Sequence, residues 1–296
     1  MTKTINYNKK TSEELGWRPD WFGCEEINDE LTEKIKEFQR EMGIQADGMC
    51  GPGTFRRKFN ERAEELERSD SDPNYSDHII CHGDAVPIEW DRVVLWTDNA
   101  GHKAKEGNYK KVTGKRDIDL FVTHWDVCLS SDICQRVLDK RGISVHFLID
   151  NDGTIYQTLD TTHVAWHAGG ANKRSVGVEI ANAYYPKWQS WYEKKGFGKR
   201  KILEDSIVNG RKLETHLDFY PIQKEALKAL AKALNAGLSI PLEAPQNLNG
   251  SQYTDTLSKP KLKAFKGFIH HYHQTSKKID CGGLDLVKLM EECKNG

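Results

Sequence analysis

Several features that would assign a protein class at once are missing from this sequence. Its 43 basic residues are offset by 44 acidic ones, so it lacks the basic excess of a typical nucleic-acid-binding protein. No apolar run approaches the roughly 18 residues of a membrane helix. No apolar stretch follows the charged N-terminus, as one would in a secretory signal peptide. We therefore expect a soluble monomer made in the cytoplasm, with no nucleic-acid partner and no membrane segment.

Cysteine pairs of the kind that build a disulfide framework are missing too. The seven cysteines are an odd number, are scattered along the chain and include no Cys-x-x-Cys pair. Such a set is typical of reduced thiols, most of which pack in the core as small hydrophobic side chains. No internal repeat is visible either.

What is present begins with a short helical region. Apolar residues recur at helical spacing over 31–42, and Pro52 can open a second helix that runs to 59. The almost wholly polar stretch that follows is typical of a linker. We expect three parts: a small all-α domain over 1–68, a linker over 69–76 and a larger domain over 77–296.

The larger domain has a mixed α/β pattern. The predicted strands cover 78–81, 92–97, 118–123, 145–149, 154–159, 175–181 and 264–269, and the predicted helices cover 132–140, 221–235 and 284–293. Asn151-Asp152-Gly153 predicts a hairpin turn. The segment 184–217 has no clear period and is expected to be a surface insertion. The fold class is therefore α/β, with a mixed central β-sheet flanked by helices.

Two of the predicted strands lead into histidines. His124 follows one apolar strand, and the run from His270 to His273 follows another, a few residues before Asp280 and Cys281. One histidine from each strand end plus Asp280 or Cys281 would give three zinc ligands and leave a fourth position for water, as in a catalytic zinc site. The alternative is a set of solvated histidines beside a C-terminal loop.

Five linked motifs decide between these interpretations. They are THWD at 123–126, SVHFLIDNDGTIYQ at 144–157, AWHAGG at 165–170, NKRSVGVEIAN at 172–182 and KIDCGG at 278–283. In this order they resemble the zinc-dependent N-acetylmuramoyl-L-alanine amidases, a family that also includes a phage lysozyme and the peptidoglycan recognition proteins. The resemblance implies a Zn²⁺ cofactor and bacterial peptidoglycan as the substrate.

The resemblance also implies a ligand set. It gives His124 as the first ligand, a histidine of the late strand as the second and Asp280 as the third. His271 is preferred as the second ligand, with His270 as the alternative; strand alternation points the two to opposite faces, so only one can bind. Cys281 stands where the family usually has proline, and its sulfur is the alternative to Asp280.

Further roles follow from the same motifs. The resemblance implies that Glu179 is the general base and that Lys278 stabilises the oxyanion. A carboxylate in a buried strand is rare without a function. The expected substrate-binding residues are Trp166, His167 and Asn172, for which packing around a glycine-rich loop is the alternative. Two further residues are assigned no catalytic role: Val145 stands where some relatives have tyrosine, and His146 is expected to be a supporting histidine rather than a ligand.

The first domain has its own resemblance. The stretch IKEFQREMGIQADGMCGPGTFRRKF at 35–59 is similar to the helical peptidoglycan-binding module, with its Phe-Gln helix, Asp-Gly turn and Gly-Pro-x-Thr segment. This implies anchoring to the cell wall. The alternative is a helical subdomain that only packs on the enzyme.

These features predict a wall-anchored, bacteriolytic hydrolase that cleaves the amide bond between N-acetylmuramic acid and L-alanine. The rival interpretations are a non-catalytic peptidoglycan-recognition or inhibitory protein on the same fold and an endopeptidase that cuts within the stem peptide. A wall hydrolase without a signal peptide is typical of a phage endolysin or of a toxin delivered by a secretion system, and the sequence does not choose between them.

Overall fold

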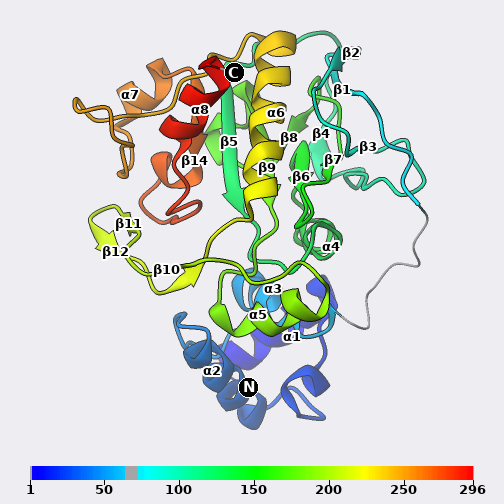
Figure 1. Ribbon diagram of the computed structural model, residues 1–296. Helices are drawn as coiled ribbons and strands as arrows, with labels where there is room; N and C mark the ends of the chain where they lie inside the picture. The colour runs from blue at the N-terminus through cyan, green and yellow to red at the C-terminus, as the bar shows by residue number, and fades with distance from the viewer. Residues whose placement is uncertain (1, 64–71, 296) are drawn as a thin grey trace.

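A computed structural model of the protein describes residues 2–63 and 72–295. The helical N-terminal part lies at one end of the molecule, and the α/β part forms the rest (Figure 1). The predicted linker over 69–76 lies outside the described residues as far as 71, and Ser76 already pairs with the α/β part through a bridge to Val93. None of the described helices combines the length and apolar character that crossing a membrane requires.

The α/β part is built on a six-stranded mixed sheet. Its strands lie in the order β14-β5-β9-β6-β7-β3. Their bounds are β3 (Val93–Leu95), β5 (Leu120–Trp125), β6 (Phe147–Ile149), β7 (Ile155–Gln157), β9 (Ser175–Ile180) and β14 (Gly267–His270). The run β14-β5-β9-β6 is parallel, and β7 joins β6 as the antiparallel partner of a hairpin. The predicted mixed sheet and hairpin are therefore confirmed.

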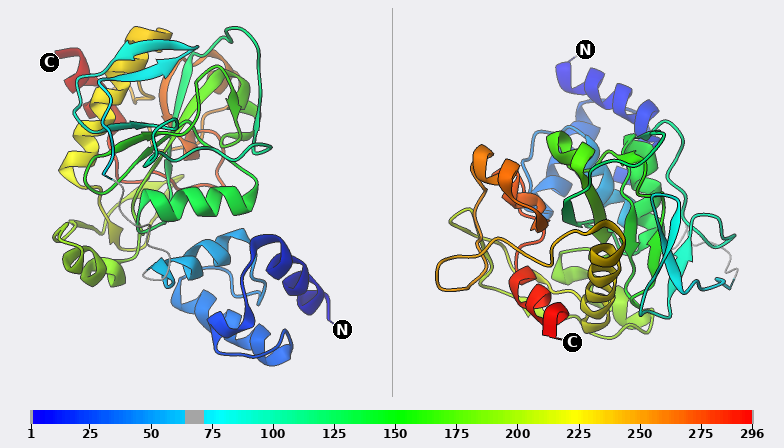
Figure 2. Two further views of the ribbon diagram at one scale, coloured as in Figure 1. Left: turned by 90° about the vertical axis from the view of Figure 1, so that its right-hand side faces the viewer. Right: turned by 90° about the horizontal axis from the view of Figure 1, so that it is seen from above.

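Helices cover both faces of this sheet (Figure 2). The long α6 (Pro221–Leu238) packs with α8 (Leu286–Asn295) over one face of the sheet. Apolar side chains of β5 and β9 on this face join the same core cluster. The helix α4 (Ser131–Arg141) covers part of the other face. It begins at Ser130, whose hydroxyl accepts from the Ile133 amide, and ends at Gly142 in the left-handed conformation.

The remaining elements of the α/β part are short. The strands are β1 (His78–Cys81), β2 (Asp84–Pro87), β4 (Tyr109–Lys110), β8 (Val164–Ala165), β10 (Ile202–Leu203), β11 (Ile207–Val208), β12 (Arg211–Lys212) and β13 (His216–Leu217). The helices are η3 (Gly169–Arg174), η4 (Pro186–Trp188), α5 (Gln189–Lys194), α7 (Lys259–Ala264) and η5 (His271–His273). The short strands form two-stranded antiparallel pairs outside the main sheet.

The N-terminal module consists of α1 (Lys3–Leu15), η1 (Pro19–Phe22), α2 (Asp29–Glu41) and α3 (Pro52–Asn60). Its turn between α2 and α3 is organised by Gln39, which is almost fully buried. The Gln39 amide donates to Asp47 Oδ1, the Met49 carbonyl and Thr54 Oγ1, and its oxygen accepts from the Gly48 amide. One glutamine therefore satisfies most of the polar groups in the Asp-Gly turn.

The module docks on the α/β part through a shared apolar core. Leu31, Ile35 and Phe55 belong to the same buried cluster as Leu129 and Leu138 of the α/β part, and α1 and α3 both contact α4. Asn60 adds polar contacts: its side-chain amide donates to the Val127 carbonyl at 2.9 Å, and its oxygen accepts from the Leu129 amide. The loop that follows β5 is thereby bonded directly to α3.

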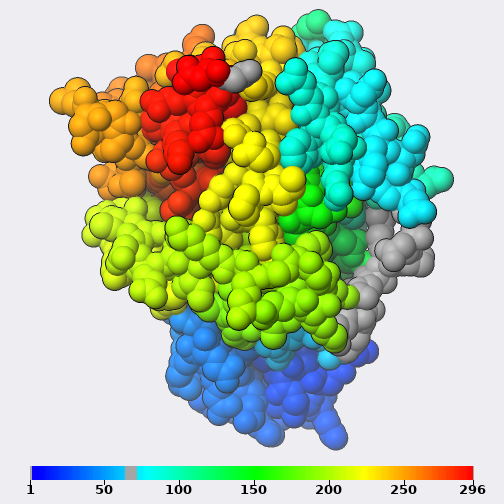
Figure 3. All heavy atoms as spheres, viewed as in Figure 1, coloured from blue at the N-terminus to red at the C-terminus, as the bar shows by residue number. Residues whose placement is uncertain are grey.

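Two parts of the fold differ from the sequence-based predictions. The helix α1 was not predicted, because its apolar positions are few and several of its buried side chains are polar, such as Asn8 and Thr11. The segment 184–217 is not merely a surface insertion: Tyr192 and Leu217 are fully buried in the core shared with the module. In Figure 3 this segment forms a yellow-green band between the module and the body of the molecule.

Candidate metal centre and active site

The candidate site lies at the carboxyl ends of the neighbouring parallel strands β14, β5 and β9. His124 of β5 is in register with Glu179 of β9, and His270 of β14 is in register with Thr123. Partners in adjacent parallel strands point to the same face, so His271 lies beside His124, whereas His270 lies with Thr123 on the opposite face. The register therefore separates the two candidate histidines.

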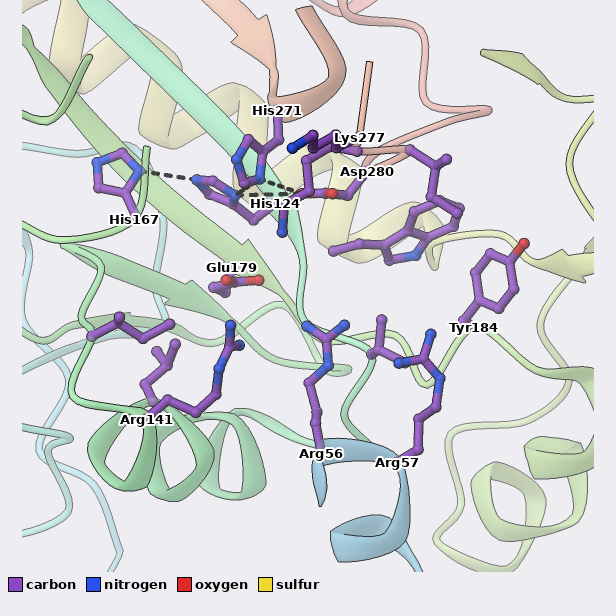
Figure 4. A pocket seen from close by; sticks show the side chains of 16 residues that line it. Arg56, Arg57, His124, Arg141, His167, Glu179, Tyr184, His271, Lys277 and Asp280 are labelled. Atoms are coloured by element: carbon purple, nitrogen blue, oxygen red, sulfur yellow. Dashed lines mark hydrogen bonds and ion pairs between the residues drawn. The ribbon is translucent and has the colours of Figure 1, made fainter. Parts of the chain in front are cut away.

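Three side chains converge here on one point (Figure 4). The two Nδ1 atoms of His124 and His271 are 2.9 Å apart, and Asp280 Oδ2 lies 3.0 Å from His271 Nδ1 and 3.4 Å from His124 Nδ1. Ligands placed about 2.1 Å from a tetrahedral zinc are about 3.4 Å from one another. These two imidazole nitrogens and one carboxylate oxygen therefore fit a zinc ion in both chemistry and spacing.

The orientation of His124 supports this fit. Its Nε2 lies 2.9 Å from Nδ1 of His167, and Nε2 of His167 lies 3.3 Å from the Ser175 hydroxyl. Burial lowers the pKa of His167 well below its usual range, so its ring is neutral, and in the tautomer with the proton on Nε2 its Nδ1 accepts a hydrogen bond from the His124 Nε2–H. The lone pair of His124 then sits on Nδ1 and faces His271 and Asp280, as a metal ligand requires.

A glycine makes room for this arrangement. A Cβ atom on Gly177 of β9 would lie 2.4 Å from Nδ1 of His167, closer than real contacts allow. The imidazole therefore rests directly on the strand backbone, and only glycine permits that approach at this position.

Glu179 presents an unpaired carboxylate oxygen beside this cluster. The side chain is 8% exposed, and its Oε2 has no hydrogen-bond partner within the part of the chain that the structure describes. Burial raises the pKa of the Glu179 carboxyl above its usual range. A buried carboxylate with a free oxygen at the edge of a cavity is suited to accept a proton from water.

These residues line a cavity of about 240 Å³. We call His124, Glu179, His271 and Asp280 the sheet wall, because the first three stand on or directly after strands and Asp280 lies against His271. The exposed Lys278 lies at the rim of the same cavity. Burial lowers the pKa of the His271 imidazole, and the positive charge of Lys278 makes a smaller contribution in the same direction.

The expected substrate-binding residues lie in different places. His167 lines the cavity, as described above, but Trp166 and Asn172 are not among the residues that line it. Trp166 is 38% exposed on the surface. Asn172 accepts from the backbone amides of His167 and Ala168, and so holds the loop that carries His167. The structure gives Asn172 a positioning role in that loop.

The alternative ligands point away from the cavity. Nδ1 of His270 is 2.7 Å from Thr123 Oγ1, and its Nε2 is 2.9 Å from the Leu284 carbonyl. Cys281 is fully buried, and burial raises the pKa of its thiol. His146 is also buried and lies within hydrogen-bonding distance of the Gly177 amide and the His163 carbonyl.

A second group of metal-ligand types, Asp126, Cys128 and Cys134, lies deeper in the protein. Asp126 Oδ1 already accepts from the backbone amides of Cys128 and Asn182. Burial raises the pKa of both thiols, which keeps them protonated, and none of the three residues lines the cavity. This group is part of the core beneath the loop after β5.

The opposite side of the cavity includes three arginines that sequence analysis did not single out. Arg56 and Arg57 belong to α3 of the N-terminal module, and Arg141 ends α4. Figure 4 shows the guanidinium groups of Arg56 and Arg141 rising from the two helices toward Glu179 and His124, whereas that of Arg57 lies on the side of Tyr184. We call these three residues the arginine wall. No local pattern marks them, because the cavity forms only when the module docks on α4.

Comparison with known proteins agrees with this architecture. A family model described as N-acetylmuramoyl-L-alanine amidase matches residues 114–280, more than half of the chain, and a second, described as a putative peptidoglycan binding domain, matches residues 26–57. The chain therefore belongs to the N-acetylmuramoyl-L-alanine amidase family and carries a peptidoglycan-binding module. Both family resemblances found in the sequence are confirmed. No curated protein sequence matches the chain significantly.

Solved structures with similarity to the chain include two named amidases and a protein in complex with a muramic pentapeptide. AmiD from E. coli, in complex with anhydro-N-acetylmuramic acid-L-Ala-D-gamma-Glu-L-Lys, is 22% identical over 45% of this chain and 49% of that chain, with a TM-score of 0.31. AMPDH3 from Pseudomonas aeruginosa, in complex with anhydromuramic pentapeptide, is 18% identical over 64% of this chain and 65% of that chain, with a TM-score of 0.39. The endolysin LysCS from Clostridium intestinale URNW is 17% identical over 69% of this chain and 95% of that chain, with a TM-score of 0.37. The chain thus spans about half the length of the AmiD structure and 65% of the AMPDH3 structure.

Proposed function

We propose that this protein is a zinc-dependent N-acetylmuramoyl-L-alanine amidase that hydrolyses the amide bond between N-acetylmuramic acid and L-alanine in bacterial peptidoglycan. One observation carries the proposal: in a chain of this family, the three donor atoms of His124, His271 and Asp280 converge beside the unpaired oxygen of Glu179. His124, His271 and Asp280 would hold the metal. When bound, zinc supplies a Lewis acid that polarises the scissile carbonyl and lowers the pKa of water.

The protein side chains supply the proton transfers. Hydrolysis adds the oxygen of water to the lactyl carbonyl carbon, breaks the carbon–nitrogen bond and transfers a proton to the departing nitrogen of L-alanine. Glu179 would accept the proton from the attacking water and return it to that nitrogen. Lys278, at the rim of the cavity, would stabilise the negative charge that develops on the carbonyl oxygen.

The module would bind peptidoglycan and keep the enzyme at its substrate. Binding at one site raises the effective concentration of the wall at the other without adding chemistry. The site of action would then be the bacterial cell wall, and the products would be a glycan strand with free lactyl carboxylates and a stem peptide with a free L-alanine amino terminus.

A metal-dependent cleavage assay tests this proposal. The zinc-loaded protein is incubated with anhydro-N-acetylmuramic acid-L-Ala-γ-D-Glu-L-Lys, and the released peptide is sequenced from its amino terminus. We expect a new terminus at L-alanine, which disappears after treatment with a chelator and returns with zinc. Cleavage inside the peptide would support an endopeptidase instead, and binding without cleavage would support a recognition protein.

A further inference from the structure

Two guanidinium groups of the arginine wall have no partner. Among residues 2–63 and 72–295, the side chains of Arg56 and Arg141 make no hydrogen bond or ion pair, and Nε of Arg56 is buried without an acceptor. Arg57 differs, since it donates to the Tyr185 hydroxyl at 2.6 Å and to the Gly53 carbonyl at 3.0 Å. Arg57 therefore fastens the module to the catalytic domain, whereas Arg56 and Arg141 are left to face the cavity.

Holding these charges together is costly in the free protein. Burial lowers the pKa of both Arg57 and Arg141, and the positive charge of Arg56 lowers both further. Glu179 is the nearby acid, but its carboxylate forms no ion pair with either Arg56 or Arg141 in the described part of the chain. Partly buried cations that lack a hydrogen-bonded partner are stabilised when an anionic ligand supplies one.

The guanidinium group indicates which anion. Its planar set of donors matches a carboxylate better than an ammonium group does, and each charge-assisted hydrogen bond is about twice as strong as a neutral one. In a stem peptide that begins L-Ala-γ-D-Glu, the γ linkage leaves the α-carboxylate of the glutamyl residue free. That carboxylate is one residue away from the amide bond that Glu179 would help to cleave.

We propose that Arg56 and Arg141 bind the α-carboxylate of the γ-linked glutamyl residue, so that the N-terminal module contributes directly to substrate selection in the catalytic cavity. The identity of the ligand rests on the proposed amidase function. The module then has a second role beside anchoring, because Arg56 of α3 completes a subsite that the catalytic domain only half forms with Arg141.

A pair of peptides that differ in one group tests the subsite. Isothermal titration calorimetry compares L-Ala-γ-D-Glu-L-Lys with the same peptide bearing an α-carboxamide on the glutamyl residue, using the full-length, zinc-loaded protein. We expect the acid to bind at least about 10-fold more tightly than the amide, which is the range of a charge-assisted contact. The kcat/KM values of the two matching muropeptides are expected to differ in the same direction, mainly through KM.

Variants assign the preference to the two arginines. Arg56→Gln and Arg141→Gln are each expected to weaken binding of the acid about 10-fold and to leave binding of the amide unchanged. Arg56→Lys keeps the positive charge and is expected to retain part of the preference for the acid. Comparing it with Arg56→Gln shows whether the preference depends on the charge at this position or is lost because the protein misfolds. Arg40→Gln on the exposed face of α2 makes the same charge change in the same module and is expected to preserve the full preference.

The outcomes separate this inference from the proposed function. Equal binding of acid and amide by the unmodified protein, or equal weakening of both by Arg56→Gln and Arg141→Gln, overturns the subsite even if the muropeptides are cleaved. Acid preference that depends on both arginines, without any cleavage, supports the subsite and overturns the amidase proposal.

Discussion

The two walls of the cavity are built in opposite ways. On the sheet wall, every ligand candidate is held by a neighbour: His124 by His167, and Asp280 by the two histidines that it approaches. On the arginine wall, Arg56 and Arg141 project from two helices in different parts of the chain, and neither side chain has a hydrogen-bond or ion-pair partner among the described residues. The ligand candidates are thus held in place by strand register and by contacts with one another, whereas the two arginines are left free to bind an incoming anion.

The comparison predicts that substitution of a metal ligand on the sheet wall abolishes zinc binding. Asp280→Ala removes the carboxylate that both histidines approach, so we expect loss of bound zinc and a decrease in turnover of at least about 10³-fold, beyond the 10–100-fold typical of a supporting residue. Zinc content after gel filtration and the rate of muropeptide cleavage measure these effects. Cys281→Ala, at the next residue, is the matched control and should retain zinc; zinc loss in that variant alone would assign the third ligand to sulfur.

A second change separates proton transfer from metal binding on the same wall. Glu179→Gln should keep zinc and lower kcat by about 10²–10⁴-fold, the usual contribution of a general base. Because burial raises the pKa of the Glu179 carboxyl, the carboxylate form is lost at a higher pH than in an ordinary glutamate, and activity should decrease as the pH falls into the acid range. This acid limb of kcat/KM should vanish in Glu179→Gln. An unchanged acid limb in the variant would assign it to another group.

A smaller effect on zinc binding is expected from His167, which contacts the ligand His124. His167→Phe removes the acceptor for the His124 Nε2 proton and should weaken zinc binding by about 10–100-fold without eliminating it. Competition with a zinc-binding dye measures the affinity. The adjacent Trp166→Phe, at the surface outside the cavity, should leave the affinity unchanged. Equal affinities in His167→Phe and the unmodified protein would show that His124 needs no such support.

The smallest predicted effect concerns the docking that brings the arginine wall into place. Asn60→Ala removes the side-chain partner of the Val127 carbonyl and of the Leu129 amide. We therefore expect the free energy of unfolding to decrease by about 1–3 kcal/mol. Urea denaturation measures this, with the exposed Asn74→Ala as control. If Asn60→Ala unfolded at the same urea concentration as the unmodified protein, the contact would have no part in holding the module.

The sheet wall could be predicted from sequence because its signals are local. Apolar strands lead into His124 and the His270–His273 run, and Glu179 lies inside a strand. The ends of the strands were predicted less accurately. The predicted strand ended at residue 123, but β5 extends through Trp125, so His124 lies within it. The sequence also left open which late histidine joins His124, since the answer depends on the β14–β5 register, a long-range pairing.

The arginine wall could not be predicted, for a physical reason. Arg56 and Arg57 lie in a short amphipathic helix, where exposed charges are ordinary, and Arg141 stands in the last turn of α4, where a cation is favoured by the helix dipole. They come together in the cavity only through packing between segments far apart in the chain. The same holds for the segment 184–217, whose burial against the module leaves no periodic signal.

The pairing of His124 with Glu179 across β5 and β9 has a consequence for insertions and deletions. Side chains alternate along a strand, so gaining or losing one residue in β9 before Glu179 would turn its carboxylate to the α6 face and separate it from His124. A loop absorbs the same change at its surface. A scan of single-residue insertions should therefore find that insertions in β9 abolish activity. Insertions in the exposed loops 195–199 and 247–251 should leave activity intact.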